Sequence, residues 1–356
     1  MIHRASIVAR LVAALFAAQT FPAGSAPIPL PNSPAVQLPG ASPAQGKVVE
    51  GLKALNAGDL AAAEAAFTEA ARVDPKLSGA YIGLAEVAGR QDKPARVEYW
   101  LKQALTADPN SAMMQRVWGR HQFQRGRFVE AEAAFKKAIA LDPRSSDAQL
   151  NLAENYLFGL KKAKPAEAAY RAAIALDAGS AQAHLGLPAT LGAPGQPDAA
   201  LAESQQAAKL APAHPKFTHA LARFQASQGR FDQALVAQQK TIAIAPDFFP
   251  AYIDLGDLYL VKNDLEQAAA AYRAGAKVTK NPATALFKLG TVLEGQQRWA
   301  EAEQAYLDAV KSDPTMYSAY NNLAFMAAVR KERLDDALAW AKKAVELAPK
   351  VTTTQD

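Results

Sequence analysis

The 356-residue sequence predicts an all-α fold, a solenoid of repeated helical hairpins, because three markers recur in one phase. Small residues recur at intervals of 34 or 35 residues, a spacing typical of helical repeat proteins. Prolines follow them by twelve residues, and large apolar side chains follow them by four. The small residues are Ala63, Ala131, Ala166, Ala200, Ala234, Ala268, Ala302 and Ala337, with Val97 in the single gap. Three markers in fixed phase are hard to obtain by chance.

Each period predicts two helices joined by a tight turn. Two stretches with apolar residues at helical spacing lie between successive prolines, and both are rich in good helix formers. Turn signals separate the two stretches, as at residues 56–59 and 125–127. The second helix ends before a proline such as Pro143, because the residue before proline avoids the helical conformation. The unit is an antiparallel hairpin, and the phase gives nine of them, with one-residue insertions near 161–164 and 330–333.

Small and large residues occupy fixed places within the unit. Small residues at the eighth place, such as Gly51, let helices approach closely. Large residues at the seventh and twenty-fourth places, such as Leu84 and Phe67, fill the space between hairpins. This pattern resembles the tetratricopeptide repeat over residues 44–349. The resemblance implies a right-handed α-solenoid of about nine repeats, whose first helices line a concave face that in this family commonly holds peptide segments.

The N-terminal residues predict export. His3 and Arg4 precede an apolar run at 11–18 that is too short to span a bilayer, and small residues follow up to Ala26. We expect a cleavable signal peptide at 1–26; an uncleaved anchor is the alternative. Residues 27–46 are dense in proline and predict a disordered linker, and residues 350–356 predict a short disordered tail. Without cysteine there is no lipidation site, so the expected location is the periplasm or the cell exterior.

The fifth repeat, residues 181–197, departs from the pattern. Pro188 stands at the eighth place, and proline inside a helix costs about 3 kcal/mol, so the first helix should be short, kinked or partly lost. Ser204 and Gln238 replace the aromatic residue at the twenty-fourth place of this repeat and the next. These changes predict either a hinge between sub-arrays 44–180 and 198–349 or an irregular but rigid repeat.

Charge and motifs point away from catalysis and from nucleic acid. The net charge is +5 with both signs interspersed, which is weak support for a nucleic-acid partner. The chain has no G-x-S-x-G, H-E-x-x-H or phosphate-binding loop pattern, and His214 and His219 do not have a recognised metal-ligand spacing. We therefore expect no catalytic, cofactor or metal site.

The inward-facing fifth, sixth and ninth places of the first helices supply the candidate partner-binding residues. They are Arg116, Arg120, Asn151, Glu154, His219, Arg223, Asp254, Asp257, Lys288, Asn321, Asn322 and Phe325. Arg116, Arg120 and Asn151 lie in adjacent repeats and could together hold a carboxylate, because guanidinium forks match its geometry. That set resembles the carboxylate clamp of chaperone-binding members of the family, although the usual Lys/Asn order is absent.

Several of these residues have a second interpretation. The arginines could form an ordinary solvated face, and Asn151 and Asn322 could hydrogen-bond to backbone of the neighbouring repeat. Asp254 and Asp257 are predicted to be solvated surface rather than a cation site.

The sequence predicts a non-catalytic scaffold or adaptor of the cell envelope that binds peptide segments of other envelope proteins. The alternative is a glycan-binding accessory of polymer export, although aromatic residues near the face are few: Phe123, Phe158, Phe287 and Phe325. After signal removal we expect no stable membrane span. The last helix is predicted to expose Trp340 and Leu347, which suggests self-association.

Overall fold

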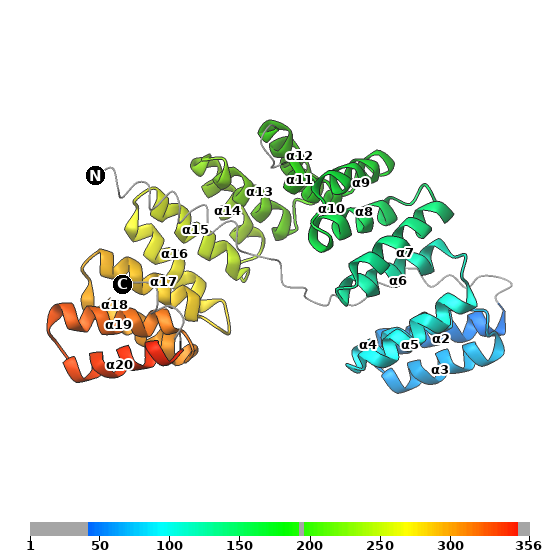
Figure 1. Cartoon of the computed structure of the whole chain (residues 1–356), viewed down its shortest axis with the longest axis horizontal. Coiled ribbons are helices and arrows are strands. Elements are labelled where there is room, and N and C mark those ends of the chain that lie inside the picture. The colour runs from blue at the N-terminus through cyan, green and yellow to red at the C-terminus, as the bar shows by residue number, and fades with distance from the viewer. Residues whose placement is uncertain (1–41, 192–195, 348–356) are drawn as a thin grey trace. The chain divides into compact units, whose positions relative to one another are not determined.

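The computed structural model describes residues 42–191 and 196–347 (Figure 1). The predicted signal peptide, residues 27–41 of the predicted linker and the predicted tail lie outside the described residues. The chain divides into two compact units at Glu203 and Ser204. We call their described parts the N-terminal unit (42–191 and 196–203) and the C-terminal unit (204–347).

The described residues form nine successive helical pairs and contain no strand, which confirms the predicted all-α solenoid. The first four pairs are α2 (Pro43–Asn56) with α3 (Leu60–Val73), α4 (Ser78–Arg90) with α5 (Pro94–Ala107), α6 (Ala112–Gln124) with α7 (Phe128–Leu141), and α8 (Ser146–Glu154), extended by η1 (Asn155–Gly159), with α9 (Ala163–Leu176). The fifth is α10 (Ala181–Gly186) and α11 (Pro188–Leu191) with α12 (Pro197–Leu210). The last four are α13 (Pro215–Ser227) with α14 (Phe231–Ile244), α15 (Phe249–Val261) with α16 (Leu265–Lys277), α17 (Ala283–Gly295) with α18 (Trp299–Ser312), and α19 (Tyr317–Arg330) with α20 (Leu334–Leu347).

Helix α2 begins within the segment that the sequence assigned to the linker. Ser42 and Gln45 form a capping box: Ser42 Oγ accepts from the Gln45 amide at 3.3 Å, and Gln45 Oε1 accepts from the Ser42 amide at 2.9 Å. Pro43 occupies the first helical turn, where its missing N–H costs nothing. The prediction that the linker extends to residue 46 is therefore wrong for residues 43–46, because this proline starts a helix rather than an extended segment.

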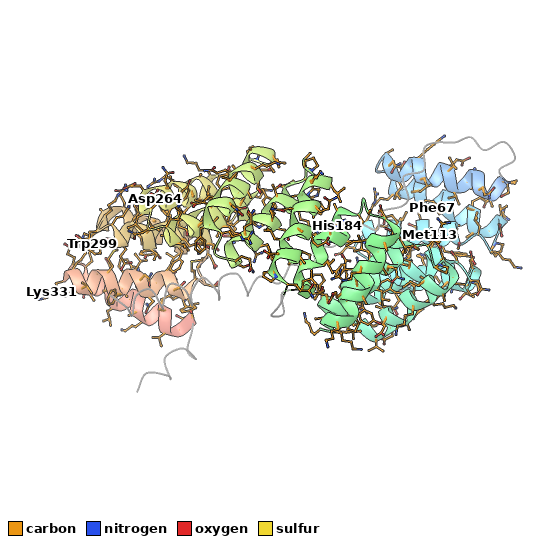
Figure 2. The ribbon with its side chains drawn as sticks, turned by 90° about the horizontal axis from the view of Figure 1, so that it is seen from above. Phe67, Met113, His184, Asp264, Trp299 and Lys331 are labelled. Atoms are coloured by element: carbon orange, nitrogen blue, oxygen red, sulfur yellow. The ribbon has the colours of Figure 1, made fainter. Side chains whose placement is uncertain are left out.

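The aromatic ring at the twenty-fourth place lies directly against the eighth place of its own hairpin. A Cβ atom built on Gly51 would lie 2.6 Å from the Phe67 ring, and one on Gly256 would lie 2.3 Å from the Tyr272 ring. The sixth place of the next hairpin covers the other side of the ring, since a Cβ atom on Gly83 would lie 2.4 Å from Phe67. Phe67 is fully buried in this position (Figure 2).

Several first helices of successive repeats contact one another and form a layer within their unit. Helix α2 contacts α4, α6 contacts α8, α8 contacts α10, and α13 contacts α15. Second helices pack on the first helix that follows, as α3 does on α4 and α16 on α17. We call the side of this layer that carries the fifth, sixth and ninth places the first-helix face.

Ion pairs near the hairpin turns join successive repeats. A glutamate at the twenty-first place pairs with a basic residue of the next hairpin: Glu64 with Arg96 at 2.7 Å and Glu98 with Arg127 at 3.1 Å. Hydrogen bonds from Arg127 lower the pKa of Glu98 to about 2. In the fifth repeat the twenty-first place holds a leucine, Leu201, which is buried.

The two one-residue insertions are absorbed locally. In the fourth repeat the chain continues α8 as the π-helical turn η1, in which the amide of Leu160 donates to the carbonyl of Asn155 at 2.9 Å. In the ninth repeat the extra residue lies in the turn between α19 and α20, where Lys331 is left-handed with φ of 56° (Figure 2). The next helix begins in phase in both cases.

Pro188 breaks the first helix of the fifth repeat, as predicted. Helix α10 ends at Gly186 and α11 begins at Pro188, and the intervening Leu187 keeps helical backbone angles. Pro188 has no amide hydrogen, so the helical bond to the carbonyl of His184 cannot form. The hinge proposed for this region stays a prediction.

Replacing Gly51 with alanine tests the contact between glycine and ring. The added methyl group overlaps Phe67, so overpacking of about 1–3 kcal/mol exceeds the helix-propensity gain of up to about 1 kcal/mol, and the unfolding free energy should fall by about 1–2 kcal/mol. Gly46→Ala is the matched control on the same helix, because nothing lies within 4 Å of its added Cβ. Urea denaturation followed by circular dichroism measures both. Equal stability of the two variants would show that the Phe67 ring moves aside.

Candidate partner-binding face

Core tyrosines at the twenty-fourth place reach the first-helix face with their hydroxyl groups. The Tyr272 hydroxyl donates to Asp257 Oδ1 at 2.5 Å, and the Tyr306 hydroxyl donates to Glu294 Oε2 at 2.7 Å. Burial raises the pKa of both tyrosines, so they stay protonated and remain donors. The same ring thus fills the core and holds a carboxylate on the face.

In the N-terminal unit the candidate residues belong to an arginine cluster on α6, α8 and α9, which we define as Arg116, Arg120, Asn151, Glu154 and Tyr170. Arg116 pairs with the exposed Asp147, Nη1 to Oδ2 at 3.3 Å. Glu154 Oε1 accepts from Gln182 Nε2 of α10 at 3.1 Å. Helices α6, α8 and α10 therefore connect across three repeats through side chains on one face.

Arg120 is the charged residue of the arginine cluster that has no ion-pair partner within 4 Å among the described residues. Its side chain is half-buried. Burial, and then the positive charge of Arg116, lower the pKa of Arg120 below its usual value. The cationic form is therefore less well compensated here than in water, and an anion beside it would be stabilising.

Two buried donors of the same cluster also have no acceptor. Asn151 Nδ2 and the Tyr170 hydroxyl are buried and have no hydrogen-bond partner. Tyr170 lies on α9, against Gly186 of the next hairpin, where an added Cβ would lie 2.3 Å from its ring. An unsatisfied buried donor costs about 1–3 kcal/mol, so both groups favour a ligand or an ordered water that accepts a hydrogen bond.

In the C-terminal unit the candidate residues on α13, α15 and α17 form a histidine–aspartate cluster with Gln238 of α14 and Tyr272 of α16. We define it as His219, Arg223, Gln238, Asp254, Asp257, Tyr272 and Lys288. His219 Nδ1 lies 3.0 Å from the amide nitrogen of Gln238, and His219 Nε2 lies 3.7 Å from Asp254 Oδ2. Arg223 Nε lies 3.7 Å from the same oxygen. Lys288 Nζ binds Asp257 Oδ1 at 2.8 Å.

The expectation that Asp254 and Asp257 are solvated surface is wrong. Asp254 is only 7% exposed, and its Oδ2 atom has no hydrogen bond. Burial raises the pKa of Asp254 to about 7 and lowers the pKa of His219 to about 4. The cause is local: Gln238 replaces a large ring at the twenty-fourth place, and His219 and Asp254 fill the interior beside it.

The amides at the sixth place do not bond to backbone as one interpretation held. Asn322 Nδ2 donates to the Tyr306 hydroxyl at 3.1 Å, and Asn151 Nδ2 has no partner. The register that puts Gly83 on Phe67 puts Asn151 opposite Phe135, whose ring offers no carbonyl. Asn155 forms the bond between repeats instead, from Nδ2 to the Phe128 carbonyl at 2.9 Å.

The remaining candidates, Asn321 and Phe325, are exposed on α19 and join neither cluster. Sequence reasoning missed Tyr170, Gln238 and Tyr272, because the twenty-fourth place was assigned to the core. A hydroxyl or amide group on the residue at the twenty-fourth place is the sequence signal that identifies them.

The two histidines with the five-residue spacing serve separate purposes. His214 caps α13 by accepting from the Lys216 amide at 3.3 Å, whereas His219 bonds to Gln238. Within residues 42–191 and 196–347, no three potential metal ligands gather closely enough to hold an ion. None of the helices described there combines the length and apolar character of a membrane span.

A family model described as "Tetratricopeptide repeat" matches residues 48–112, 116–181, 253–317 and 287–351. The chain belongs to this family. The tetratricopeptide repeat model leaves residues 182–252 unmatched, and this stretch contains the Pro188 break and the substitutions Ser204 and Gln238. Membership suggests a protein–protein interaction scaffold, since repeats of this family are generally non-catalytic.

Similar proteins agree with this fold. The solved structure of a tetratricopeptide repeat protein from Parabacteroides merdae covers 70% of this chain and 98% of its own, with 16% identity and a TM-score of 0.54, which shows the fold alone. The structure of MamA matches 45% of this chain and 93% of its own, with 26% identity and a TM-score of 0.41. Protein O-mannosyl-transferase Tmtc1 of Drosophila melanogaster is 33% identical over 106 residues, 28% of this chain and only 12% of that relative's length.

The buried carboxyl of Asp254 predicts a pH-dependent effect of Asp254→Asn. Its pKa in the fold lies above the unfolded value, so its favourable contribution is present at low pH and is lost as pH rises through about 7. Asparagine avoids this loss. The variant should gain stability relative to the parent protein by up to about 1.4 kcal/mol for each pH unit between about 5 and 7.

Urea denaturation of both proteins at a series of pH values from 5 to 8 measures the difference. Asp257→Asn is the control, because it removes the ion-pair partner of Lys288 and should lower the unfolding free energy at every pH of the series. A stability difference that does not change with pH would show that Asp254 is ionised throughout.

Proposed function

We propose that this tetratricopeptide repeat protein is a non-catalytic scaffold that binds acidic peptide segments of partner proteins at the arginine cluster of its N-terminal unit. The observation that carries the proposal is the half-buried Arg120 guanidinium, which has no ion pair, in a cluster with two buried donors that have no acceptor. A carboxylate supplies the negative charge that would pair with Arg120, and its oxygen atoms accept hydrogen bonds.

The neighbouring surface fits a peptide rather than a free anion. Met113, at 39% exposure, lies one turn before Arg116 on α6 and is an exposed apolar side chain next to the cluster. An extended segment with an apolar side chain next to an acidic one would use both kinds of contact.

The expected cellular setting rests on the sequence. The predicted signal peptide at 1–26 supports export, and the absence of cysteine from the chain fits a protein without lipid attachment at that signal. The proposed partners are accordingly other proteins of the cell envelope.

The aromatic side chains give glycan binding less support. A sugar ring stacks on an exposed aromatic face, but Phe123 lies against Phe128 with ring centroids 5.5 Å apart, and Phe287 lies against Tyr306 at 5.8 Å. Phe158 and Phe325 are exposed, yet they belong to different units. The described residues of neither unit present a row of exposed rings along the first-helix face.

Charge reversal at the arginine cluster tests the proposal. The mature protein is crosslinked to partners in its own cell envelope, with and without the paired changes Arg116→Glu and Arg120→Glu. At least one partner should be lost, and peptides from that partner should bind the variant at least about thirtyfold more weakly, because truncating a buried charge pair costs about 2–5 kcal/mol. Overlapping peptides should place the contact at an acidic residue.

The matched control is the pair Arg144→Glu and Arg171→Glu, which makes the same charge change at exposed positions of the same unit outside the first-helix face. Circular dichroism checks that both variants remain helical. A partner list that is the same for all three proteins would contradict the proposal, and so would a lost partner whose peptide binds without its acidic residue.

A further inference from the structure

Exposed apolar side chains gather on the hairpin of α19 and α20. Among the described residues, eight large apolar side chains are more than half exposed, and five of them lie on this hairpin. The five are Phe325 at 61%, Val329 at 60%, Leu334 at 57%, Leu338 at 56% and Val345 at 51%. Leu334, Leu338 and Val345 lie on α20, and we call these three the α19–α20 surface; Phe325, at the ninth place, belongs to the first-helix face.

The sequence had assigned the exposed face of α20 to other residues. Trp340 and Leu347 are half-buried; Trp340 packs against the core of the C-terminal unit, and the Arg333 guanidinium lies 5.1 Å from its ring centre. The prediction that Trp340 and Leu347 form the exposed patch is wrong, because a different face of α20 is the exposed one. Leu334, Leu338 and Val345 follow one another at helical spacing and form the actual apolar stripe.

The preceding repeat shows what covers this kind of surface. Trp299, Tyr306 and Val310 of α18 stand at the places that Leu334, Ala341 and Val345 hold in α20. They pack in one cluster with Ala319, Leu323 and Met326 of α19, which are all buried. The covering element is therefore an amphipathic helix with a small residue, a leucine four positions later and another apolar residue three positions after that.

The residue type at position 338 favours burial of this surface. The place of Leu338, the twenty-first, holds glutamate in Glu64, Glu98, Glu132, Glu167 and Glu303. Where an earlier repeat has leucine there, Leu201 is buried and Leu235 is half-buried. Glutamate at this place is compatible with contact with water, whereas leucine at 56% exposure favours burial against a partner.

A second copy of the chain does not offer the complementary helix at its first repeat. Gly46, Lys47 and Glu50 of α2 hold the places of Ala319, Tyr320 and Leu323, and Lys47 pairs with Glu50 at 2.7 Å. An ion pair that replaces an aromatic residue and a leucine would be desolvated against an apolar surface. Head-to-tail stacking of two copies is therefore disfavoured.

We propose that the α19–α20 surface binds an amphipathic helix of a partner protein, packed as α19 packs on α18. The partner helix presents a small residue and a leucine at the spacing of Ala319 and Leu323. The site lies in the C-terminal unit, and it is independent of the arginine cluster in the N-terminal unit.

The chain itself supplies the probe. A synthetic, fluorescently labelled peptide of residues 315–331 carries the sequence of α19 and should bind the full mature protein in an anisotropy titration extended to about 1 mM. Binding should weaken at least about tenfold for Leu338→Lys, because a charge would then face the apolar side of the peptide. A peptide with Leu323→Asp should weaken by a similar factor.

Val236→Lys is the matched control, since Val236 is 68% exposed on α14 and lies outside the α19–α20 surface. Circular dichroism verifies that both protein variants keep their helices. The proposal is overturned if the peptide fails to bind, or if Leu338→Lys and Val236→Lys bind it equally. It is also overturned if the parent protein is a dimer that Leu338→Lys converts to a monomer, because a second copy would then cover the surface. Failure of acidic peptides to bind the arginine cluster would contradict the proposed function, but it would not affect the binding of the α19 peptide to the α19–α20 surface.

Discussion

The close contact between a small eighth place and the ring at the twenty-fourth place is the constraint on which the other features depend. Where glycine occupies that place, the ring lies closer to the helix backbone than any Cβ would allow, as Gly256 and Tyr272 show. The sixth place of the next hairpin closes the other side of the ring. One ring therefore sets both the packing inside a hairpin and the spacing to its neighbour.

The same contact decides which polar groups of the first-helix face are satisfied. With tyrosine at the twenty-fourth place, a hydroxyl reaches the face and binds Asp257 or Glu294. With phenylalanine, as opposite Asn151, no hydrogen-bonding group is offered, and the amide is left without a partner. Where Gln238 occupies the place, the His219 imidazole and the Asp254 carboxyl are both buried beside it. The chemistry of the face thus follows from residues that belong to the core.

The hairpins, the Pro188 break and the positions of the insertions could be predicted because they depend on local rules: helical spacing, proline geometry and phase. The arginine cluster could be predicted in part, because places on one helix face are fixed by the period. The burial of Asp254 and the exposed stripe of α20 could not. Both depend on which side chains of a neighbouring repeat lie opposite. A small rotation of α20 about its axis decides whether Trp340 or Leu338 is exposed.

The π-helical turn η1 illustrates how the array keeps its phase. Adding one residue to an α-helix rotates all later side chains by about 100°, which would turn the first-helix face of the next repeat away from its neighbours. Widening a single turn from four to five residues takes up the extra residue before α9 begins. Repeat length and side-chain direction are thereby uncoupled, so the coding sequence can gain a codon at such a position while every downstream contact between hairpins keeps its original pair of residues.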